Sequence, residues 1–382
     1  MNGQSPEIEG LWSDLDKVEA NGHGKPTERV EDNLRSPEVA KDASRLSWSV
    51  VIITRNEAAN TAACLESVLY AFDGRDVEIV LVDSASTDDT VEIARRFPIR
   101  TICLPPSKHL NPSIGRATGF AHTTGEYVLF LDGDCILDSA WVAPAEQALA
   151  EDPSLGGIAG ASFGLLPPDA DGVRQVQDEY PRADYDNPTY LAGSAAYRRE
   201  VLDKVGCFNP NLHACEEEEF GARVRKGGWR MRRLRQTMSQ HHPKHAKETT
   251  SELIRRFRRR YFIGLGQLVR HTIAHELPIG GILTTVNRHI VYFSMLLAGA
   301  VAAVAAALFA TPAPVLSWLA GMTLAFAAFA VKSRGIRKPA YYFLEWTLAS
   351  PMVMLGLAMR PVGSEERRPG LDPVAVHEPS QG

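Results

Sequence analysis

Two carboxylates follow a strongly apolar stretch in the first half of the chain. Tyr127–Leu131 is apolar or aromatic and β-prone, which predicts a strand buried on both faces, and Asp132, Gly133 and Asp134 come directly after it. Unpaired carboxylates are costly to bury, but the carboxyl edge of a parallel sheet is where open α/β folds bind ligands. Oxygen ligands of this kind suit Mg²⁺ or Mn²⁺ together with a diphosphate. The alternative is a strand that simply ends in an Asp-Gly turn.

Polar residues also follow two earlier predicted strands. Trp48–Thr54 is a β-branched run that precedes Glu57, and Glu78–Val82 ends at Asp83. Between the predicted strands lie segments with helical spacing, at 58–70, 89–97 and 111–122. Strands that alternate with helices in this way predict a parallel α/β sheet. The carboxyl ends of its strands meet at one edge, so we expect these polar clusters to lie close together.

Four sequence motifs, read together, resemble a known enzyme family. They are VVIITRNEAANTAACLESV, VLVDSASTDDT, GRATGFAHTTGEYVLFLDGDC and CEEEEFGARVRKGGW, spread over roughly Trp48 to His242. Their order and spacing resemble those of the family 2 glycosyltransferases. The resemblance implies a GT-A fold, which is Rossmann-like with a mostly parallel sheet. It also implies an inverting enzyme that uses nucleotide-activated sugars.

The resemblance carries donor-binding roles onto particular residues. It implies that Thr54, Glu57 and Asp83 hold the nucleoside base and ribose. Asp132 and Asp134 correspond to the family's Asp-x-Asp, with Asp134 as the more direct ligand of Mg²⁺ or Mn²⁺ and Asp132 as a second metal or sugar contact.

Arg116 corresponds to the arginine of the family's Arg-Asn-x-Gly sequence, so the resemblance makes it a further nucleotide-sugar contact. Ala117 stands where that sequence has its Asn.

The resemblance also points to the catalytic base. Glu217 takes the place of the family's catalytic Asp. A Glu at this position adds one methylene to the side chain, while the ionisable group remains a carboxylate of similar intrinsic pKa. Glu216 is the alternative base. His241 or His242 stands where some GT-A enzymes have a further metal ligand, although surface histidines in a loop are common.

Composition limits the class of protein. The chain has 382 residues, a formal net charge of −5 and five scattered cysteines without a CxxC pair. This predicts no nucleic-acid partner, a reducing compartment and neither a zinc site nor a disulfide framework. The N-terminus shows no signal pattern, so we expect the catalytic domain to stay in the cytoplasm.

The last third of the chain predicts a membrane region. Residues 290–331 form an uncharged run of 42 residues that is interrupted at 311–314 by TPAP, which predicts two membrane spans joined by a hairpin turn. Basic flanks place both outer ends in the cytoplasm. Ala340–Met359, interrupted by Glu345 and Pro351, could span, re-enter or lie in the interface. Before the spans, Arg255–Arg260 interleaves arginines with apolar residues, which is typical of an interfacial helix on anionic lipid.

We therefore predict five regions. They are a disordered acidic arm (1–45), a GT-A domain (46–245), an amphipathic interfacial segment (246–288), a transmembrane region with two spans and a possible third (289–360), and a polar tail (361–382).

The predicted function is a multi-pass enzyme of the cytoplasmic (inner) membrane that transfers a hexose-type sugar to a lipid-linked or surface-glycan acceptor. The donor is expected to be UDP-linked, with GDP- and dTDP-sugars as alternatives. After Trp229 there is no Gln-x-x-Arg-Trp, which favours one sugar per encounter over polymerisation.

Two other functions remain open on the sequence. A nucleotidylyltransferase usually has a Gly-rich loop after its first strand, and TRNEAAN has no glycine. The other is a membrane protein that keeps the fold without catalysis, an alternative raised by Ala117 and Glu217.

Overall fold

The computed structural model describes residues 47–107, 110–166, 176–243, 249–366 and 372–379. The predicted acidic arm at 1–45 lies outside these residues, and so do residues 244–248, at the boundary between the predicted GT-A domain and the predicted interfacial segment.

One eleven-stranded sheet organises the part of the chain that the structure describes before the C-terminal helices. Nine of its strands follow the order β11-β3-β2-β1-β4-β9-β6-β10-β5, and the other two, β7 and β8, pair with β6 and β10. The parallel part of the sheet consists of β3 (Arg100–Cys103), β2 (Val77–Asp83), β1 (Trp48–Thr54) and β4 (Tyr127–Asp132). Beyond it, β9 (Ala195–Arg198) runs antiparallel between β4 and β6 (Leu155–Leu165), β10 (Arg230–His241) is parallel to β6, and β5 (Cys135–Leu137) closes that side. The predicted parallel α/β arrangement is confirmed for these four strands.

The register of the parallel strands brings the predicted polar clusters to one edge. Thr54 lies opposite Asp83, and Ile53 lies opposite Asp132. The β1 and β4 strands are buried almost throughout, so the sheet itself fixes where these polar strand ends lie.

The helices of this domain are α2 (Ala58–Ala71), α3 (Thr90–Ala94), α4 (Pro112–Ala121), α5 (Val142–Glu151), α6 (Arg199–Val205) and α7 (Glu216–Lys226). The 3₁₀ turn η1 (Ser139–Trp141) directly precedes α5. Helix α4 lies very close to β1, because a Cβ at Gly119 would collide with Val51 and one at Gly115 with Ile53. Asn111 caps α4 by accepting a hydrogen bond of 3.0 Å from the Ile114 N–H. The close approach of α4 places Arg116, on its buried face, next to the strand ends.

Several elements differ from the sequence-based expectation. The segment Pro167–Pro188 is rich in Asp, Pro, Gly and Tyr, which predicts a loop. It contains β7 (Val176–Tyr180), which pairs with β6, and the short β8 (Tyr185–Asp186), which pairs with β10. The basic run after α7 continues into β10, whose arginines alternate with buried residues such as Met231. Within the tail, β11 (Ala375–His377) pairs antiparallel with β3. The partners of β8, β10 and β11 are far away in the chain, which local patterns do not reveal, whereas β7 pairs with the strand just before it.

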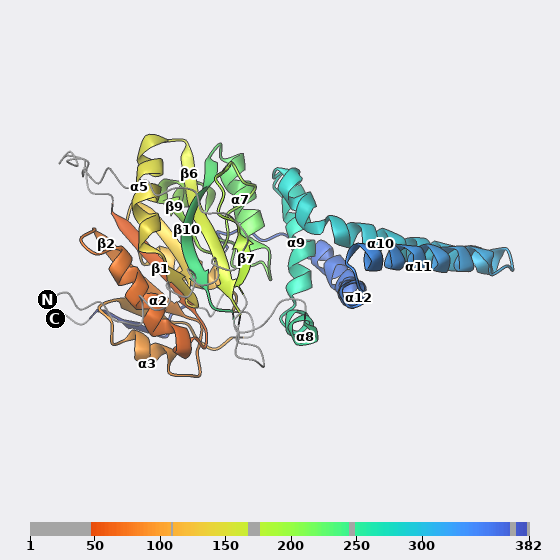
Figure 1. Ribbon diagram of the computed structural model, residues 1–382, viewed down its shortest axis with the longest axis horizontal. Helices are drawn as coiled ribbons and strands as arrows, with labels where there is room; N and C mark the ends of the chain where they lie inside the picture. Colours follow the sequence, from red (N-terminus) through yellow and green to blue (C-terminus); the bar gives the residue numbers. More distant parts are fainter. Residues whose placement is uncertain (1–46, 108–109, 167–175, 244–248, 367–371, 380–382) are drawn as a thin grey trace, which may run out of the picture.

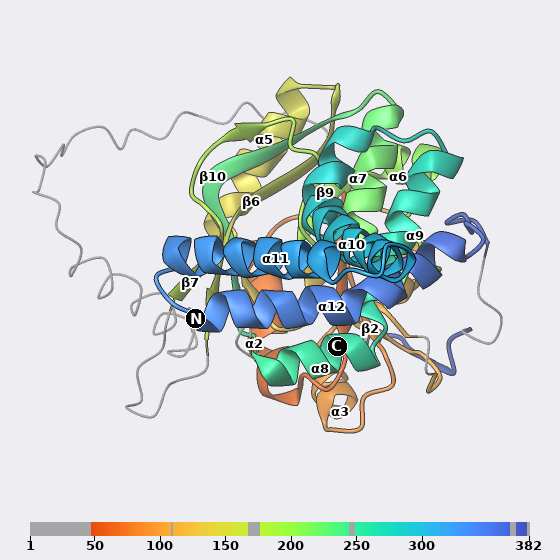
Figure 2. The ribbon, with the colours of Figure 1, turned by 90° about the vertical axis from the view of Figure 1, so that its right-hand side faces the viewer.

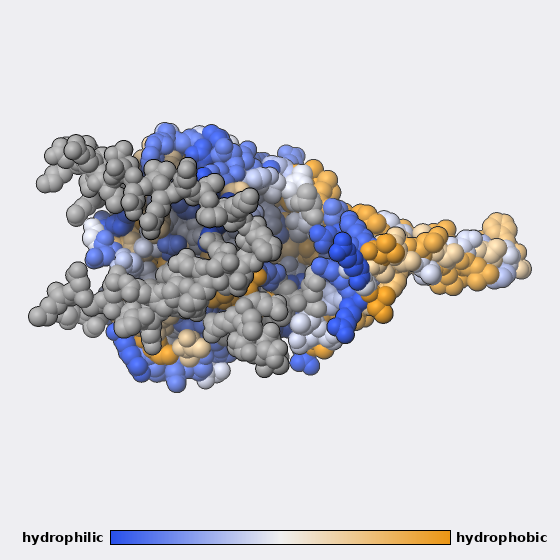
Figure 3. Space-filling view, in the orientation of Figure 1, coloured by the Kyte–Doolittle hydropathy of each residue, from blue (hydrophilic) through white to orange (hydrophobic). Residues whose placement is uncertain are grey.

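Five helices follow the sheet domain: α8 (Thr250–Arg258), α9 (Tyr261–Ala274), α10 (Ile279–Leu308), α11 (Ala313–Lys332) and α12 (Arg337–Ala358). Figure 1 shows α10 and α11 as a hairpin that projects away from the sheet domain, with α8, α9 and α12 between the two. Within the described residues, two stretches are long and apolar enough to cross a membrane, Thr285–Leu308 and Ala313–Lys332. None of the α11 residues is buried, and apolar colour gathers on this hairpin in Figure 3.

Helix α12, the third apolar stretch, packs along the other helices instead of projecting alone. Its Gly356 meets Gly266 of α9 at a crossing so close that a Cβ on either glycine would collide with the opposite backbone. Glu345 is buried and forms an ion pair with Arg256 of α8, at 3.3 Å from Nη1 to Oε1. Figure 2, which looks at the molecule from the side of the hairpin, shows α12 running alongside α11 and across α8 and α9.

Candidate active site

The first part of the site is the donor edge, which we define as the strand ends Thr54 and Asp83 with the loop that follows β2. Asp83 is almost completely buried, and its carboxylate accepts hydrogen bonds from the Ser86 N–H at 2.8 Å, from the Ser86 hydroxyl and from the Thr54 hydroxyl at 3.3 Å. A pocket of about 710 Å³ opens here, with Arg55, Asp83 and Leu104 in its lining. The donor edge therefore offers a carboxylate held by neutral donors beside a cavity that suits a nucleoside.

The loops on the two sides of this pocket bond to each other. Asn56, whose φ is 56°, accepts the Thr87 N–H at 2.7 Å and donates its own N–H to the Ser86 hydroxyl at 2.8 Å. Glu57 starts α2, and its carboxylate accepts a hydrogen bond of 2.9 Å from Asn60. Glu57 thus lies next to the donor edge, but it does not line the pocket as Asp83 does.

The second part of the site is the Asp132-Gly133-Asp134 turn after β4. A side chain at Gly133 would collide with Thr54, so only glycine lets this turn lie against the donor edge. The Gly133 N–H donates to the carbonyl of Ile53 at 2.9 Å. The two carboxylates point to different partners, Asp132 to Arg116 and Asp134 to His241.

The third part is a buried charge cluster that joins α4, β4 and the start of α7. Arg116 is 2% exposed and lies 2.9 Å from Asp132 Oδ1 and 3.4 Å from one carboxylate oxygen of each of Glu216 and Glu217. The Phe208 ring covers its guanidinium at 5.0 Å. Three carboxylates therefore share one cation, which leaves an excess of negative charge at this position.

This excess charge changes the acid–base properties of the cluster. Burial and the neighbouring Glu216 carboxylate raise the pKa of Glu217 to about 8, against the opposing effect of Arg116. Burial also raises the pKa of Glu216, and burial together with Glu217 raises that of Glu218 to about 7. Burial lowers the pKa of Arg116, but Asp132 and the two glutamates outweigh it and raise that pKa overall. The Glu217 side chain is 24% exposed and that of Glu216 only 9%, so Glu217 is the more accessible proton acceptor.

His241 and His242 have different positions relative to Asp134. His241 Nε2 lies 3.1 Å from Asp134 Oδ2, while the His242 N–H donates to the Asp134 main-chain carbonyl at 2.8 Å and its imidazole lies 2.8 Å from the Gln240 amide. The structure thus brings His241, and not the His242 ring, to the carboxylate. Burial alone would lower the pKa of His241, but hydrogen bonds to Asp134 and Glu179 raise it to about 10.

The residues around Asp134 fit a divalent cation that is completed by substrate. Within the described part of the chain, no group of three His, Cys, Asp or Glu side chains is arranged to hold a metal ion. Glu179 bonds to the Nδ1 side of the His241 ring and Asp134 to the Nε2 side, so those carboxylates approach from opposite directions. Magnesium sites in enzymes commonly use one or two carboxylates plus substrate phosphates and water, so Asp134 together with substrate oxygens is enough for such a site.

Sequence reasoning did not assign two of these residues to the site. Glu179 lies on β7, in the segment whose composition predicts a loop, and Phe208 gave no signal because apolar residues are common. Gly193 lies in Leu191–Tyr197, which resembles the family's small-residue segment beside the donor sugar, but the side chains that it contacts were not predicted. A Cβ at Gly193 would collide with Arg116 Nη2 and lie 3.2 Å from Glu217 Oε1, so the glycine permits the contact between these two side chains.

Comparisons with known proteins agree with this fold. Residues 49–206 match the model of the family described as glycosyl transferase family 2. A glycosyltransferase of Haloferax volcanii, AglE, is 34% identical over 98 residues, which cover 25% of this chain and 32% of that protein. An uncharacterized glycosyltransferase of Nostoc sp. is 30% identical over 178 residues, which cover 42% of this chain and 54% of that protein. The chain thus spans about a third and about half of these two relatives.

A solved structure shares the fold over most of the chain. The mannosyltransferase PcManGT of Pyrobaculum calidifontis, in complex with GDP-Man and Mn²⁺, aligns with a TM-score of 0.52 and 22% identity. The alignment covers 83% of this chain and 91% of that one. The predicted fold class is confirmed. By the matched model, residues 49–206 form a domain of glycosyl transferase family 2, and the chain shares its fold with the Pyrobaculum structure.

Proposed function

We propose that the protein transfers a single sugar, with inversion, from a nucleotide-sugar to a hydroxyl of a membrane-associated acceptor. The observation that carries the proposal is the contact of Arg116 with both Asp132 and Glu217. Through Arg116, Asp132 of the turn after β4 is connected to Glu217, a partly exposed carboxylate whose pKa is raised. The sugar donor and the catalytic base would therefore lie close together in this cluster.

The reaction would be a single displacement. Glu217 would take the proton from the acceptor hydroxyl while that oxygen bonds to the anomeric carbon, and the bond from this carbon to the diphosphate oxygen would break on the opposite side. Glu216 is too enclosed for this role and would act by raising the basicity of Glu217. Arg116 would hold Glu217 and Asp132 in a fixed relation, which supplies the orientation that a displacement needs.

The cation would be held by Asp134, with Asp132 and His241 as the other protein groups able to contribute. When bound, Mg²⁺ or Mn²⁺ would supply positive charge to the departing diphosphate. Thr54 and Asp83 would hold the nucleoside in the pocket of the donor edge, with Glu57 beside it.

The acceptor would be a lipid-linked molecule or a growing surface glycan at the cytoplasmic face of the inner membrane. The exposed apolar hairpin α10–α11 and the arginines of α8 support this assignment. Single cysteines at Thr311, in the turn of the hairpin, and at Ser333, after α11, can be tested with a membrane-impermeant thiol reagent in intact cells. Labelling at Thr311 and protection at Ser333 are expected, and the reverse pattern would exclude a cytoplasmic catalytic domain.

Transfer assays with purified full-length protein and a panel of radiolabelled nucleotide sugars test the activity itself. UDP-sugars come first, and GDP-mannose with Mn²⁺ is included because the Pyrobaculum neighbour was solved with both. Sugar transfer to membrane lipid extract or sugar-specific hydrolysis supports the proposal. Release of diphosphate from a sugar phosphate and a nucleoside triphosphate would instead indicate a nucleotidylyltransferase. Tight nucleotide binding without turnover would indicate a protein that keeps the fold without catalysis.

A further inference from the structure

The start of α7 is positioned by a segment that we call the hinge segment, residues 207–215. Cys215, the residue before α7, has a φ of 64°, and no side chain caps the helix there. The four glutamates 216–219 follow at once. Without a local cap, the position of Glu217 depends on what holds the hinge segment in place.

Helix α9 holds the hinge segment directly through Gln267. This side chain is 5% exposed, and its Oε1 accepts the His213 N–H and the protonated His213 Nδ1, both at 3.0 Å. Its Nε2 donates to the Asn211 carbonyl at 3.3 Å. One turn earlier on α9, a Cβ at Gly264 would lie 2.5 Å from the Ala214 backbone nitrogen, so the helix backbone itself lies against the hinge segment. Both ends of one buried amide are therefore bonded to the segment that leads to Glu217.

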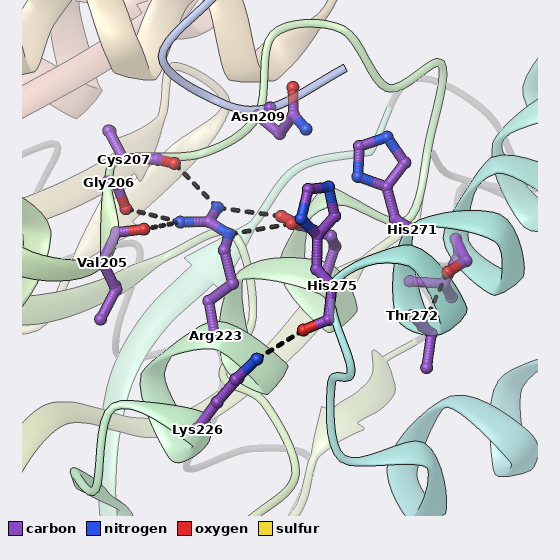
Figure 4. A network of polar contacts seen from close by, with 12 residues as sticks. Val205, Gly206, Cys207, Asn209, Arg223, Lys226, His271, Thr272 and His275 are labelled. Atoms are coloured by element: carbon purple, nitrogen blue, oxygen red, sulfur yellow. Dashed lines mark hydrogen bonds and ion pairs between the residues drawn. The ribbon is translucent and has the colours of Figure 1, made fainter. Parts of the chain in front are cut away.

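A second connection runs from α9 through the chain that follows α12. His271, one turn after Gln267, accepts the Val362 N–H at 3.2 Å, and the Val362 carbonyl accepts the Asn209 amide at 2.8 Å. Figure 4 shows His271 and Asn209 on facing sides of this junction. In the same view Arg223 of α7 binds Glu219 and the carbonyls of residues 205–207, so the beginning of the hinge segment is tied back to the catalytic helix.

The opposite side of the hinge segment is bonded to the helix that carries Arg116. Asn111, the cap of α4, donates to the carbonyls of Pro210 at 3.0 Å and Leu212 at 2.7 Å. One segment thus contacts α4, which carries Arg116, and leads into α7, which carries Glu217. A displacement of this segment changes the distance between the two side chains.

We propose that Gln267 is a positioning residue for the catalytic base, through which the helices beside the membrane set the Arg116–Glu217 geometry. The inference rests on the proposed function. It predicts a selective effect, because the donor edge on β1 and β2 is separate from the hinge segment: Gln267 governs turnover and leaves donor binding unchanged. It also makes α9, which leads directly into the spanning helix α10, part of the catalytic apparatus.

Gln267→Met tests the proposal, since it keeps the size of the side chain and removes all three hydrogen bonds. In full-length protein we expect kcat to fall by about 10- to 10²-fold, the range expected for a displacement of up to roughly 1 Å. The KM for donor and the Kd for nucleotide should stay within about twofold of wild type. Gln267→Glu keeps the two accepted bonds and should restore most of the turnover, and it also serves if Gln267→Met folds poorly.

Thr272→Val is the matched control on the same helix. Its hydroxyl is equally buried but donates within α9, to the Leu268 carbonyl at 2.7 Å. We expect unchanged turnover for this variant. An independent readout is amide hydrogen exchange of residues 213–217, which should accelerate in Gln267→Met and not in Thr272→Val.

The outcomes separate this inference from the proposed function. If the wild type transfers sugar and Gln267→Met does so within about twofold of it, the positioning role is excluded while the function stands. If donor Kd weakens in parallel with kcat, Gln267 has a general structural role and the inference is also wrong. If the wild type transfers no sugar but exchange at 213–217 still responds selectively, Gln267 positions this helix and the proposed function fails.

Discussion

The two sides of the candidate site balance their charges differently. On the donor edge, one buried carboxylate, Asp83, is surrounded by neutral hydroxyl and N–H donors from Thr54 and Ser86. In the charge cluster, three carboxylates surround the one guanidinium of Arg116. The first arrangement is complete without a ligand. The charge cluster holds more negative charge than the Arg116 guanidinium neutralises. Protonation of one carboxylate or binding of another cation would reduce this excess charge. The donor edge is therefore prearranged, whereas the charge cluster remains in an unfavourable electrostatic state.

The largest expected effect comes from Asp134, on the turn that lies against the donor edge. Asp134→Ala removes the principal candidate ligand for the divalent cation, so the stabilisation of the departing diphosphate would be lost. We expect transfer to fall by at least about 10³-fold, which corresponds to several kcal/mol of transition-state stabilisation, and metal-dependent nucleotide binding to weaken. Asp138→Ala is the control, because that carboxylate only caps η1 through the Ala140 N–H at 2.9 Å. If the transfer rate of Asp134→Ala stays within twofold of the wild-type rate, Asp134 is not a metal ligand.

Glu217→Gln tests the charge cluster at its exposed end. The amide keeps the shape of the side chain but cannot accept the proton, so turnover should fall by about 10² to 10⁴ with donor affinity nearly unchanged. Glu217→Asp shows whether the site is adapted to the longer side chain, in which case Asp is slower than Glu. Glu216→Gln is expected to be milder. A normal rate for Glu217→Gln beside an inactive Glu216→Gln would assign the base to the preceding residue.

Gly193→Ala tests the Arg116–Glu217 contact of the charge cluster without changing a charged group. The added methyl would collide with Arg116 Nη2 and displace the guanidinium from Glu217. We expect a loss of turnover of up to about 10²-fold, typical of small misplacements, in steady-state transfer assays. Gly280→Ala, in the first turn of α10, has nothing within 4 Å of the new Cβ and serves as the control. Equal rates for both variants would show that the cluster tolerates a displaced Arg116.

The smallest predicted effect is on stability against pH. Between about pH 4.5 and 8 the folded protein keeps Glu217 protonated while the unfolded chain ionises it, so the folded state binds more protons. The free energy of unfolding should therefore decrease as pH rises through this window. Glu217→Gln should flatten the decrease when thermal unfolding is compared at pH 5 and pH 8. An identical slope in the two proteins would contradict the unfavourable state assigned to the charge cluster.

The sequence predicts the donor edge better than the charge cluster, and the reason is physical. Thr54, Asp83 and Asp134 follow apolar β-prone runs, and the ends of parallel strands meet wherever the sheet is placed. Arg116 and Glu217 come from helices whose approach depends on tertiary packing, so only the family resemblance indicated them. The contacts of Glu179 and Gln267 depend on a strand pairing and a helix crossing between distant segments. No local pattern encodes either of those contacts.

The same contrast applies to the C-terminal third. The uncharged run predicted α10 and α11 closely, because length and hydropathy alone define a spanning helix. For α12 the sequence left three arrangements open. The ion pair of Glu345 with Arg256 and the glycine crossing with α9 determine where it packs, and both require the other helices to be in place.

The return of the chain to the sheet as β11 affects how the protein behaves in concentrated solution. Val376 pairs with Ile102, so the last strand covers the hydrogen-bonding edge of β3. An uncovered edge strand is a template for pairing with another molecule. A chain shortened after α12 would keep its active-site residues but expose β3, and oligomers or aggregates formed through that edge are its expected defect. The final residues thus act as a guard against self-association.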